Sequence, residues 1–323
     1  NMGVIQIFYY LVCPIIFGAG GAWFVARYGF RLDIMDKANN RSSHSGSIPK
    51  GGGIGILATF IFVSVLLGLL YSFWIPAVFL SLASLLGDRV DLSVTLRLFI
   101  QIACAIFVLI YFFVLTGFNN YFLFPFMVLF IAGTSNIYNF MDGINGIAGI
   151  TAVIAFGLLA FYAKSIGADE MYIVLSVSIA LSSLSFLYFN IPVARVFMGD
   201  VGSVLLGFVF ALVVIFIARD MTDFICMSGF LFLFYLDELT TMAERLKNGE
   251  SLTKAHRKHF YQLLANEMGN AHWKISFGYG IFQLMIGLAI IFLQSYGIIF
   301  VFLLYAVCSI GFICVSNIIR KKV

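Results

Sequence analysis

The 323-residue sequence carries little charge, because Asp, Glu, Lys and Arg together make up only 11% of it. A soluble domain averages about 25% charged residues. Apolar residues account for 62% of the chain, and its mean hydropathy is +1.04. Too few polar side chains remain to cover a globule in water, so a soluble fold is excluded and lipid must be the solvent.

Other features are scarce as well. There are five prolines, and the 30 glycines are typical of closely packed membrane helices. The five cysteines all lie inside apolar runs and show no CxxC spacing, so we interpret them as small core residues. No internal repeat is visible, which weakens an interpretation as a transporter built from inverted repeats.

Apolar runs dominate what is present, and a membrane span needs roughly 20 such residues. Runs occur at about 4–26, 53–71, 75–87, 97–116, 121–139, 146–163, 171–189, 203–218, 223–243, 275–294 and 297–318. The third run is short, so we expect an all-α, polytopic transmembrane bundle of ten to eleven spans. The first run is too long for a signal-peptide core and is expected to stay as a span. We treat residues 1–323 as a single integral membrane domain.

The basic residues predict how this bundle is oriented. With eleven spans, only two of the 19 Lys and Arg residues, Lys164 and Arg219, fall on the side of the N-terminus. Lys and Arg in short loops mark the cytoplasmic side. We therefore expect the N-terminus outside, the C-terminus inside and an active-site cleft facing the cytoplasm. The loops that would frame this cleft lie at about 27–52, 87–97, 139–146, 190–202 and 244–274.

Two of these loops carry aspartates beside glycine. Asp88 and Asp91 lie three residues apart in GDRVDLS, and Asp200 opens the eighth run in FMGDVGS. Such residues can simply be solvated or cap a helix. At a helix start, the same geometry can bind phosphate through backbone N–H groups and Mg²⁺ through the carboxylate. Each segment taken alone leaves both interpretations open.

A third segment carries polar residues at regular spacing. Asn136, Asn139, Asp142 and Asn145 recur every third residue in an otherwise apolar stretch. If the stretch is helical, each side chain stands beside the next and the four form a slowly winding polar ridge. Polar groups are costly in hydrocarbon, so the ridge needs a water-filled cleft, a ligand or partners on other helices. Hydrogen bonding between helices is the alternative to a functional role.

A fourth segment, AHRKHFYQ, places His256, Arg257, Lys258 and His259 within four residues. Two imidazoles and two cations are typical of an anion site. Zinc is disfavoured, because neither Cys nor a further His stands at ligand spacing. The tendency of basic residues to gather at the cytoplasmic side is the competing explanation for the two cations.

Two lesser features complete the set. Lys50 belongs to HSGSIPKGGG at 44–53, a flexible basic turn that could hold a lipid phosphate or merely interrupt a helix. Asp237 and Glu238 are acids inside the ninth run, so they are expected to face a cavity or to pair with Arg245. All these segments are expected on one face of the bundle. Carboxylates, a divalent cation and a basic loop at a membrane surface favour phosphoryl transfer.

The motifs NIYNFMDGINGIAG, FMGDVGS and AHRKHFYQLL resemble the signature loops of the polyprenyl-phosphate N-acetylhexosamine-1-phosphate transferase family. The likeness runs from residue 41 to residue 263, and the last motif is most similar to the O-antigen-initiating branch. The resemblance implies transfer of a sugar 1-phosphate from a UDP-N-acetylhexosamine to undecaprenyl phosphate, with release of UMP. It also implies a multi-pass protein of the bacterial inner membrane, dependent on Mg²⁺ with Mn²⁺ as an alternative ion. No nucleic-acid partner is expected, and a homodimer is compatible with the family.

The same resemblance assigns roles to residues. Asp200 is the main expected Mg²⁺ ligand, and Asp88 is the acid that meets the lipid phosphate and a second candidate ligand. The other expected catalytic residues are Asp142 and His256. The expected substrate-binding residues are Lys50, Asn136, Asn139, Gly143, Ile144, Asn145, Asn190, Phe197, Arg257 and His259. Among them, Gly143, Ile144 and Asn145 would line the uridine site with Asp142, and Phe197 would lie against the uracil.

Two positions depart from the family pattern. Gly87 stands where relatives often carry the first of two aspartates, and Asn145 stands where they often carry an acid. One carboxylate must then do the work usually assigned to two, and Asn145 cannot act as a base. A secondary transporter with acidic coupling sites and a non-catalytic polyprenyl-phosphate-binding protein are the alternative functions. The sequence does not indicate which UDP-sugar is used.

Overall fold

The computed structural model describes residues 4–31, 34–37, 46–90, 92–251 and 256–322. Within them, ten helical segments are long and apolar enough to cross a membrane, so the expected polytopic α-helical bundle is confirmed. The helices are α1 Val4–Tyr28, α2 Ile54–Leu66, α3 Tyr71–Val90, α4 Val94–Thr116, α5 Phe124–Phe140, α6 Ile147–Ser165, α7 Glu170–Asn190, α8 Asp200–Ile217, α9 Met221–Ser228, α10 Phe232–Lys247, α11 Phe260–Gln262, α12 His272–Leu293 and α13 Ile298–Arg320. Asp91, His44 and residues 252–255 of the predicted motifs lie outside the described residues.

The short helix is not the one that hydropathy indicated. It is the second, because α2 has 13 residues whereas α3 has 20. The third helix is longer than its apolar run because it begins at Tyr71 and continues past Asp88 to Val90. The loop expected at 87–97 is correspondingly short, and Asp88 lies on a helix end rather than in a loop.

One span contains an interruption. The helices α9 and α10 are joined by the 3-10 turn η2 (Gly229–Leu231), and together they run from Met221 to Lys247. The buried Gln283 side chain on α12 compensates the break, because it donates to the Gly229 carbonyl at 3.0 Å and accepts from the Leu233 N–H at 3.0 Å. Backbone groups released inside a membrane need such partners.

The loop after α1 contains two strands that the all-α prediction did not include. Strand β1 (Met35–Lys37) pairs antiparallel with β2 (Ser47–Pro49), and Met35 lies opposite Pro49. The residue after β2, Lys50, forms a parallel bridge with Phe197. This small hairpin ties the first loop to the segment that precedes α8.

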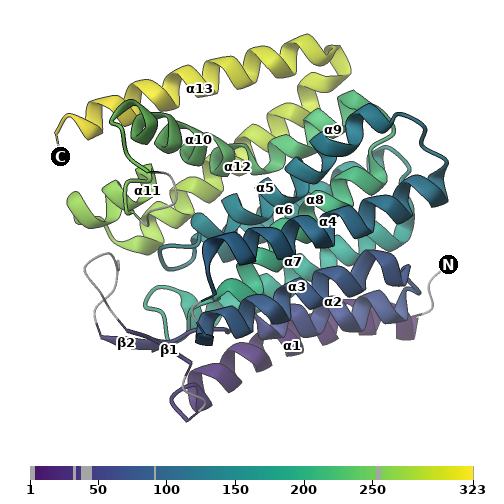
Figure 1. Cartoon of the computed structure of the whole chain (residues 1–323), viewed down its shortest axis with the longest axis horizontal. Coiled ribbons are helices and arrows are strands. Elements are labelled where there is room, and N and C mark those ends of the chain that lie inside the picture. The colour runs from purple at the N-terminus through teal and green to yellow at the C-terminus, as the bar shows by residue number, and fades with distance from the viewer. Residues whose placement is uncertain (1–3, 32–33, 38–45, 91, 252–255, 323) are drawn as a thin grey trace.

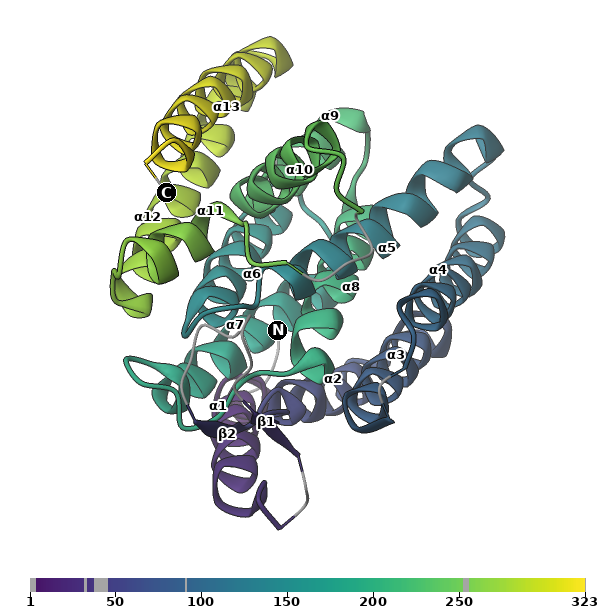
Figure 2. The same ribbon diagram turned by 60° about the vertical axis from the view of Figure 1, so that its left-hand side comes forward.

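Helix α8 forms the centre of the bundle and α13 its edge. In their most apolar windows, 89% of α8 residues are buried against 6% of α13 residues. Figure 2 shows α12 and α13 along one flank of the molecule, away from α1, α2 and α3. Close packing at the centre depends on glycine: a Cβ on Gly207 of α8 would lie 2.7 Å from the Thr134 carbonyl oxygen of α5.

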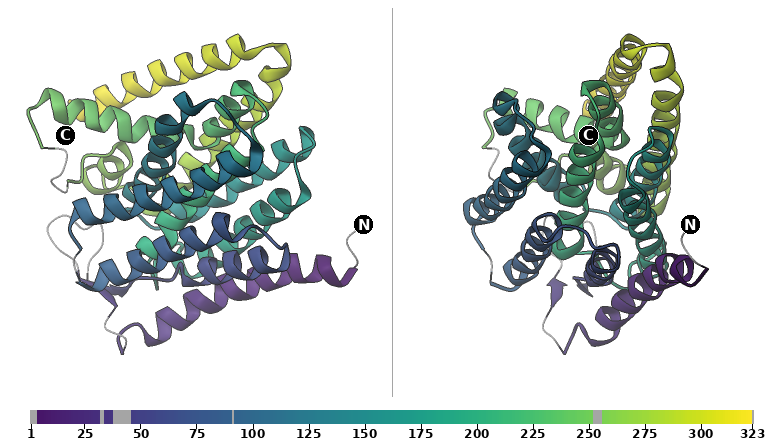
Figure 3. Two further views of the ribbon diagram at one scale, coloured as in Figure 1. Left: turned by 45° about the vertical axis from the view of Figure 1, so that its right-hand side comes forward. Right: turned by 90° about the vertical axis from the view of Figure 1, so that its right-hand side faces the viewer.

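The loops that carry the predicted motifs gather at one end of the bundle. Helix α1 begins at one end and α13 finishes at the other, as the ten long segments require when the shorter α2 also crosses (Figures 1 and 3). The β hairpin and α11 lie at the end where α13 finishes (Figure 1). Any site built from the motifs must therefore lie at this end.

Candidate active site

Two carboxylates and two cations meet where α3 ends and α8 begins. The Lys50 ammonium donates to Asp88 Oδ1 at 3.1 Å, and the Arg97 guanidinium donates to Asp200 Oδ2 at 2.5 Å. The backbone N–H of Asp200 donates to Asp88 Oδ2 at 3.3 Å and joins the two pairs. The four side chains are 9% to 32% exposed, so this ion cluster is half-buried but open to solvent. We use the term ion cluster for these four residues.

Backbone contacts between two glycine-containing segments position the ion cluster. The N–H groups of Gly51 and Gly52 donate to the Phe197 carbonyl at 3.1 and 2.9 Å, which holds Lys50 beside the start of α8. Gly199 has a φ of +73°, and a Cβ on it would lie 2.7 Å from the Gly51 backbone nitrogen. Only glycine fits both demands, so the glycine before Asp200 is explained by local geometry.

Arg97 was missed as a site residue by the sequence analysis. It lies in the first turn of α4 and also donates to the carbonyls of Gly87 at 3.0 Å and Leu92 at 3.2 Å, so it closes the α3–α4 turn. A pattern in the sequence could have found it. Arg97 and Gln101 are polar residues four apart in an apolar run, and this spacing places them on one helix face.

Asp142 lies in the loop between α5 and α6, near the ion cluster. Burial raises the pKa of Asp142 to about 7, and the negative charges of Asp200 and Asp88 contribute to the rise. The predicted polar ridge does not continue this far, because α5 ends at Phe140. The chain turns at Gly146, where φ is +88°. Asp142 and Asn145 are therefore loop residues.

The helical part of the ridge makes hydrogen bonds between helices. The Asn136 side chain donates to the Gln101 side-chain oxygen on α4 and to the Ala132 carbonyl within α5. The Asn139 side-chain oxygen accepts from the Ser203 hydroxyl on α8 at 2.6 Å. Asn136 thus links α5 to α4, whereas Asn139 links α5 to the first turn of α8 beside Asp200.

Asn145 and Asn190 join two loops. The Asn190 side-chain oxygen accepts from the Gly146 N–H at 2.6 Å, and its amide donates to the Val196 carbonyl at 2.8 Å. The Asn145 amide donates to the Pro192 carbonyl at 3.3 Å. Asn190 is 5% exposed, so its contacts lie mostly within the protein.

The remaining residues expected at the nucleotide differ in exposure. Ile144 is 6% exposed and belongs to the apolar core, whereas Phe197 is half-buried. Gly143 faces α11: a Cβ there would lie 2.2 Å from the Tyr261 hydroxyl oxygen. That hydroxyl donates to the Phe140 carbonyl at 3.1 Å, so α11 packs directly against the end of α5 and the loop that follows it.

The cations of the basic segment pair with acids close to them. Arg257 lies 3.4 Å from Glu267, and Lys258 forms an ion pair with Glu250. Burial lowers the pKa of His256 to about 4, and the interaction with His259 is the next largest cause. The ring centroids of the two histidines are 4.8 Å apart.

His259 lies inside the protein rather than on the basic surface. It is 3% exposed, with its Nε2 3.5 Å from Glu238 and its Nδ1 3.9 Å from Asp237. The Asp237 carboxylate accepts from the N–H groups of Phe260 at 2.7 Å and Tyr261 at 3.2 Å. Asp237 was expected to face a cavity or to pair with Arg245. It instead holds the start of α11, a role that its position inside an apolar run did not indicate.

The three acids predicted to be catalytic therefore lie close together, whereas the predicted catalytic histidine, His256, lies among a different set of side chains. Asp88, Asp142 and Asp200 are electrostatic neighbours. The titratable neighbours of His256 are His259, Arg245, Glu250 and Lys258. Among the described residues, no three His, Cys, Asp or Glu side chains are arranged to hold a metal ion without further ligands.

These features define a multi-pass membrane protein with paired carboxylates and cations at one end of its helices. Residues 54–218 match the model of the family described as Glycosyl transferase family 4, and the chain belongs to this family.

Three similar proteins are transferases of sugar phosphates. The chain is 30% identical over 209 residues to a probable undecaprenyl-phosphate N-acetylglucosaminyl 1-phosphate transferase of Bacillus subtilis, a match that covers 57% of this chain and 55% of that protein. It is 27% identical over 271 residues to the undecaprenyl-phosphate alpha-N-acetylglucosaminyl 1-phosphate transferase of Escherichia coli K12, covering 75% and 72%. It is 27% identical over 286 residues to the phospho-N-acetylmuramoyl-pentapeptide-transferase of Oceanobacillus iheyensis, covering 78% and 85%. The chain thus spans about half the length of the Bacillus relative.

Proposed function

We propose that this protein transfers an N-acetylhexosamine 1-phosphate from a UDP-sugar to undecaprenyl phosphate and releases UMP. The observation that carries the proposal is the ion cluster, in which Asp88 and Asp200 are joined at the meeting of α3 and α8 and each faces a cation. Both substrates bring phosphates to the membrane surface, and a site with paired charges of both signs can bind a phosphate and its counter-ion together.

The donor set suits Mg²⁺, with Mn²⁺ as the alternative. Mg²⁺ prefers carboxylate oxygens, and in phosphoryl-transfer sites one or two carboxylates hold it together with substrate phosphates and water. The two neighbouring carboxylates of Asp200 and Asp88 match this pattern, with Asp200 as the main ligand. When bound, the ion would neutralise negative charge on the diphosphate.

The cations and carboxylates of the ion cluster would exchange partners when substrates bind. Lys50 and Arg97 now neutralise Asp88 and Asp200, and the same two cations can turn to phosphate oxygens once the carboxylates have other partners. Asp88 then orients the phosphate of the lipid. An oxygen of that phosphate forms a bond to the sugar-bearing phosphorus of the donor, and the bond between this phosphorus and UMP breaks.

The α5–α6 loop and the segment before α8 would receive the nucleotide. In this proposal Asp142, Gly143 and Asn145 line the uridine site and Phe197 lies against the uracil. Ile144 and Asn190 support the loop from inside, since both are almost fully buried. Asn136 and Asn139 hold α5 against α4 and α8. His256 and Arg257 complete the phosphate or sugar contacts from the basic loop, and the buried His259 supports that loop from inside.

The pathway and orientation also belong to the proposal. The HRKHFYQ form of the last motif supports the O-antigen-initiating branch, in which the product is the first lipid-linked intermediate of a lipopolysaccharide glycan. The excess of basic residues supports a bacterial inner membrane protein whose ion cluster faces the cytoplasm.

The proposal is tested with purified protein, undecaprenyl phosphate and a panel of radiolabelled UDP-sugars. UDP-GlcNAc, UDP-GalNAc and UDP-linked 6-deoxy-N-acetylhexosamines are each assayed for UMP release with Mg²⁺, with Mn²⁺ and with EDTA. One sugar should give UMP and a labelled lipid, and Asp200→Ala should abolish both while the protein still inserts. Normal turnover by Asp200→Ala would remove the proposed metal site. Binding of undecaprenyl phosphate without UMP from any sugar would indicate a non-catalytic protein.

A further inference from the structure

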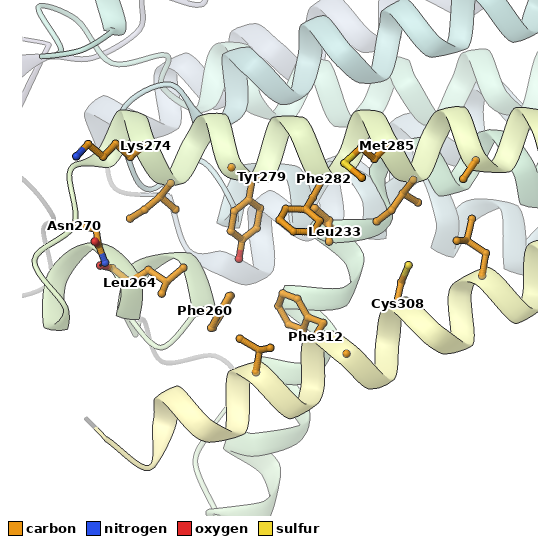
Figure 4. A pocket seen from close by; sticks show the side chains of 17 residues that line it. Leu233, Phe260, Leu264, Asn270, Lys274, Tyr279, Phe282, Met285, Cys308 and Phe312 are labelled. Carbon is orange, nitrogen blue, oxygen red and sulfur yellow. The ribbon is translucent and has the colours of Figure 1, made fainter.

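A long gap separates α12 from α13 at the edge of the bundle. The cavity between them has a volume of about 790 Å³, and its lining is almost entirely apolar (Figure 4). Phe312 of α13 and Tyr279 of α12 point into it, and Met285 and Cys308 lie at its far end (Figure 4). The gap is open at the surface, since Phe282 and Met285 of its lining are 63% and 60% exposed, so in a membrane its apolar walls face lipid.

Contacts at both ends of α13 keep the gap open. Near one end, the Tyr305 ring stacks on Phe232 at 4.9 Å and its hydroxyl donates to the Ile225 carbonyl at 2.9 Å. Near the other end, Arg320 donates to the Thr241 hydroxyl at 3.1 Å. Helix α13 is thus fixed to the α9–α10 span at two points, and the space beside α12 lies largely between them.

The mouth of the gap is polar and positive. Lys274 and Asn270 lie where α12 begins (Figure 4). The Lys274 ammonium lies 5.7 Å from the centroid of the Trp273 ring, and within the described part of the chain no carboxylate pairs with it. The N-terminus of a helix adds partial positive charge, and no side chain caps α12 among the described residues. Trp and Lys together are typical of the membrane–water interface.

The length of the gap matches one leaflet of a bilayer. From Lys274 to Ala289 the lining follows 16 residues of α12, and the 15 rises between them correspond to about 22 Å at 1.5 Å each. A bilayer with its headgroups is about 40–45 Å thick, so the headgroup lies about 20–22 Å from the midplane. A lipid whose phosphate lies at Lys274 would therefore lay its acyl chain along the whole gap.

We propose that this gap binds one anionic phospholipid, with the phosphate at Lys274 and an acyl chain between α12 and α13. Basic pockets between membrane helices bind anionic headgroups in this way. The lipid would act as a wedge that supports α13 next to the basic loop, since Phe260 of α11 and Phe312 of α13 pack together beside the gap with ring centroids 5.0 Å apart. This site does not depend on the proposed transferase activity.

Native mass spectrometry of the purified full chain tests the site, with phosphatidylglycerol and phosphatidylcholine as probes. The wild-type protein should retain one phosphatidylglycerol and bind it at least 10-fold more tightly than phosphatidylcholine. Lys274→Gln should remove this preference. Gly278→Leu and Gly311→Leu should fill the gap and reduce retention, since a Cβ at either glycine meets nothing within 4 Å.

Matched controls separate these effects from misfolding. Gly157→Leu on α6 also adds a side chain where no atom lies within 4 Å, but outside the gap, and should leave retention unchanged. Lys164→Gln removes an exposed cation from the last turn of α6 and should keep the lipid preference. Equal binding of both phospholipids, or retention unchanged in Lys274→Gln and in a folded Gly278→Leu, overturns the proposal. So does a bound undecaprenyl phosphate that phosphatidylglycerol fails to displace, because the gap would then belong to the acceptor.

Discussion

Asp88 caps a helix that begins 112 residues later, because its Oδ2 accepts from the backbone N–H of Asp200 at 3.3 Å. The first N–H groups of a helix have no partner within it, and a carboxylate is the strongest acceptor they can find. The other oxygen of Asp88 remains paired with Lys50. The same side chain therefore fixes the start of α8 and contributes one charge to the ion cluster.

The charge of Asp88 can be removed while its shape is kept. Asp88→Asn preserves an oxygen that can accept from Asp200 N–H, so we expect normal insertion and a small change in unfolding temperature. UMP release should fall by about 10²–10³, the usual cost of losing one preorganised electrostatic contact. Asp169→Asn is the control, because Asp169 is exposed and caps α7 at the opposite end of that helix from Asn190. Turnover of Asp88→Asn within a few-fold of wild type would show that the carboxylate has no catalytic role.

Much of the fold could be predicted because hydropathy alone sets where a chain can cross a membrane. All eleven apolar runs correspond to helical segments, and Asp200 was correctly expected at the start of the eighth. The error in the third run has a simple cause. Asp88 and Arg89 end an apolar run, but the backbone of α3 stays helical to Val90, and Asp88 finds ionic and N–H partners there.

Pairings between distant segments could not be read from the chain. The spacing of Arg97 and Gln101 marks a polar helix face, but it does not indicate that the partner of Arg97 is Asp200, 103 residues away. Asp237 appeared as an isolated acid, because its partners lie far along the chain: the backbone N–H groups of Phe260 and Tyr261 and the Tyr279 hydroxyl. The continuous polar ridge ended at Phe140 with α5, and the chain turns at Gly146 before α6 begins.

Arg97 offers a test of phosphate binding that separates kinetics from folding. In Arg97→Met, KM for the UDP-sugar should rise by about 10–100-fold, since a hydrogen bond to a charged group contributes about 1.5–3 kcal/mol. Arg97→Lys keeps the charge and loses the fork that reaches the Gly87 and Leu92 carbonyls. If the charge binds phosphate, the KM of Arg97→Lys should lie close to the wild-type value, even if the unfolding temperature of this variant is lowered. If KM for the UDP-sugar rises equally in Arg97→Lys and Arg97→Met, Arg97 acts only by closing the α3–α4 turn.

The buried His259 predicts how stability depends on pH. Burial lowers its pKa to about 3, and the charges of Arg320 and Arg245 act in the same direction. An unfolded histidine titrates near 6.5. Between these values the unfolded chain binds a proton that the folded protein does not, so stability is complete above pH 6.5 and falls as the pH is lowered. From pH 6.5 to 5.0 this residue should remove up to about 2 kcal/mol.

Thermal unfolding at pH 7.5 and 5.0 measures this effect. His259→Gln should be less sensitive to acid than the wild type, with the remaining slope in part from His256, whose pKa is lowered to about 4. Between pH 7.5 and 8.5 both histidines are neutral in either state, so the two proteins should show the same slope there. Parallel curves for wild type and variant down to pH 5.0 would mean that His259 is not buried among Asp237, Glu238 and Arg245.

The contact between α5 and α8 can be tested by adding one methyl group. A Cβ on Gly207 would lie 2.7 Å from the Thr134 carbonyl oxygen and 2.8 Å from the Ser135 Cα, and these are backbone atoms that cannot turn away. Gly207→Ala must therefore move α5 from α8, and overpacking of this kind costs about 1–3 kcal/mol. Because Asn139 of α5 bonds Ser203 of α8 at 2.6 Å next to Asp200, the same shift should also slow UMP release.

Gly157→Ala is the matched control, since it makes the same chemical change on α6 with no atom within 4 Å of the new Cβ. Alanine has the higher helix propensity, so this control should be neutral or slightly stabilising. The measurements are the unfolding temperature and the rate of UMP release for both variants in the same detergent. A Gly207→Ala protein as stable as Gly157→Ala would mean that α5 and α8 are not in backbone contact. The first turn of α8 would then need some other support than α5 to present Asp200 to the substrates.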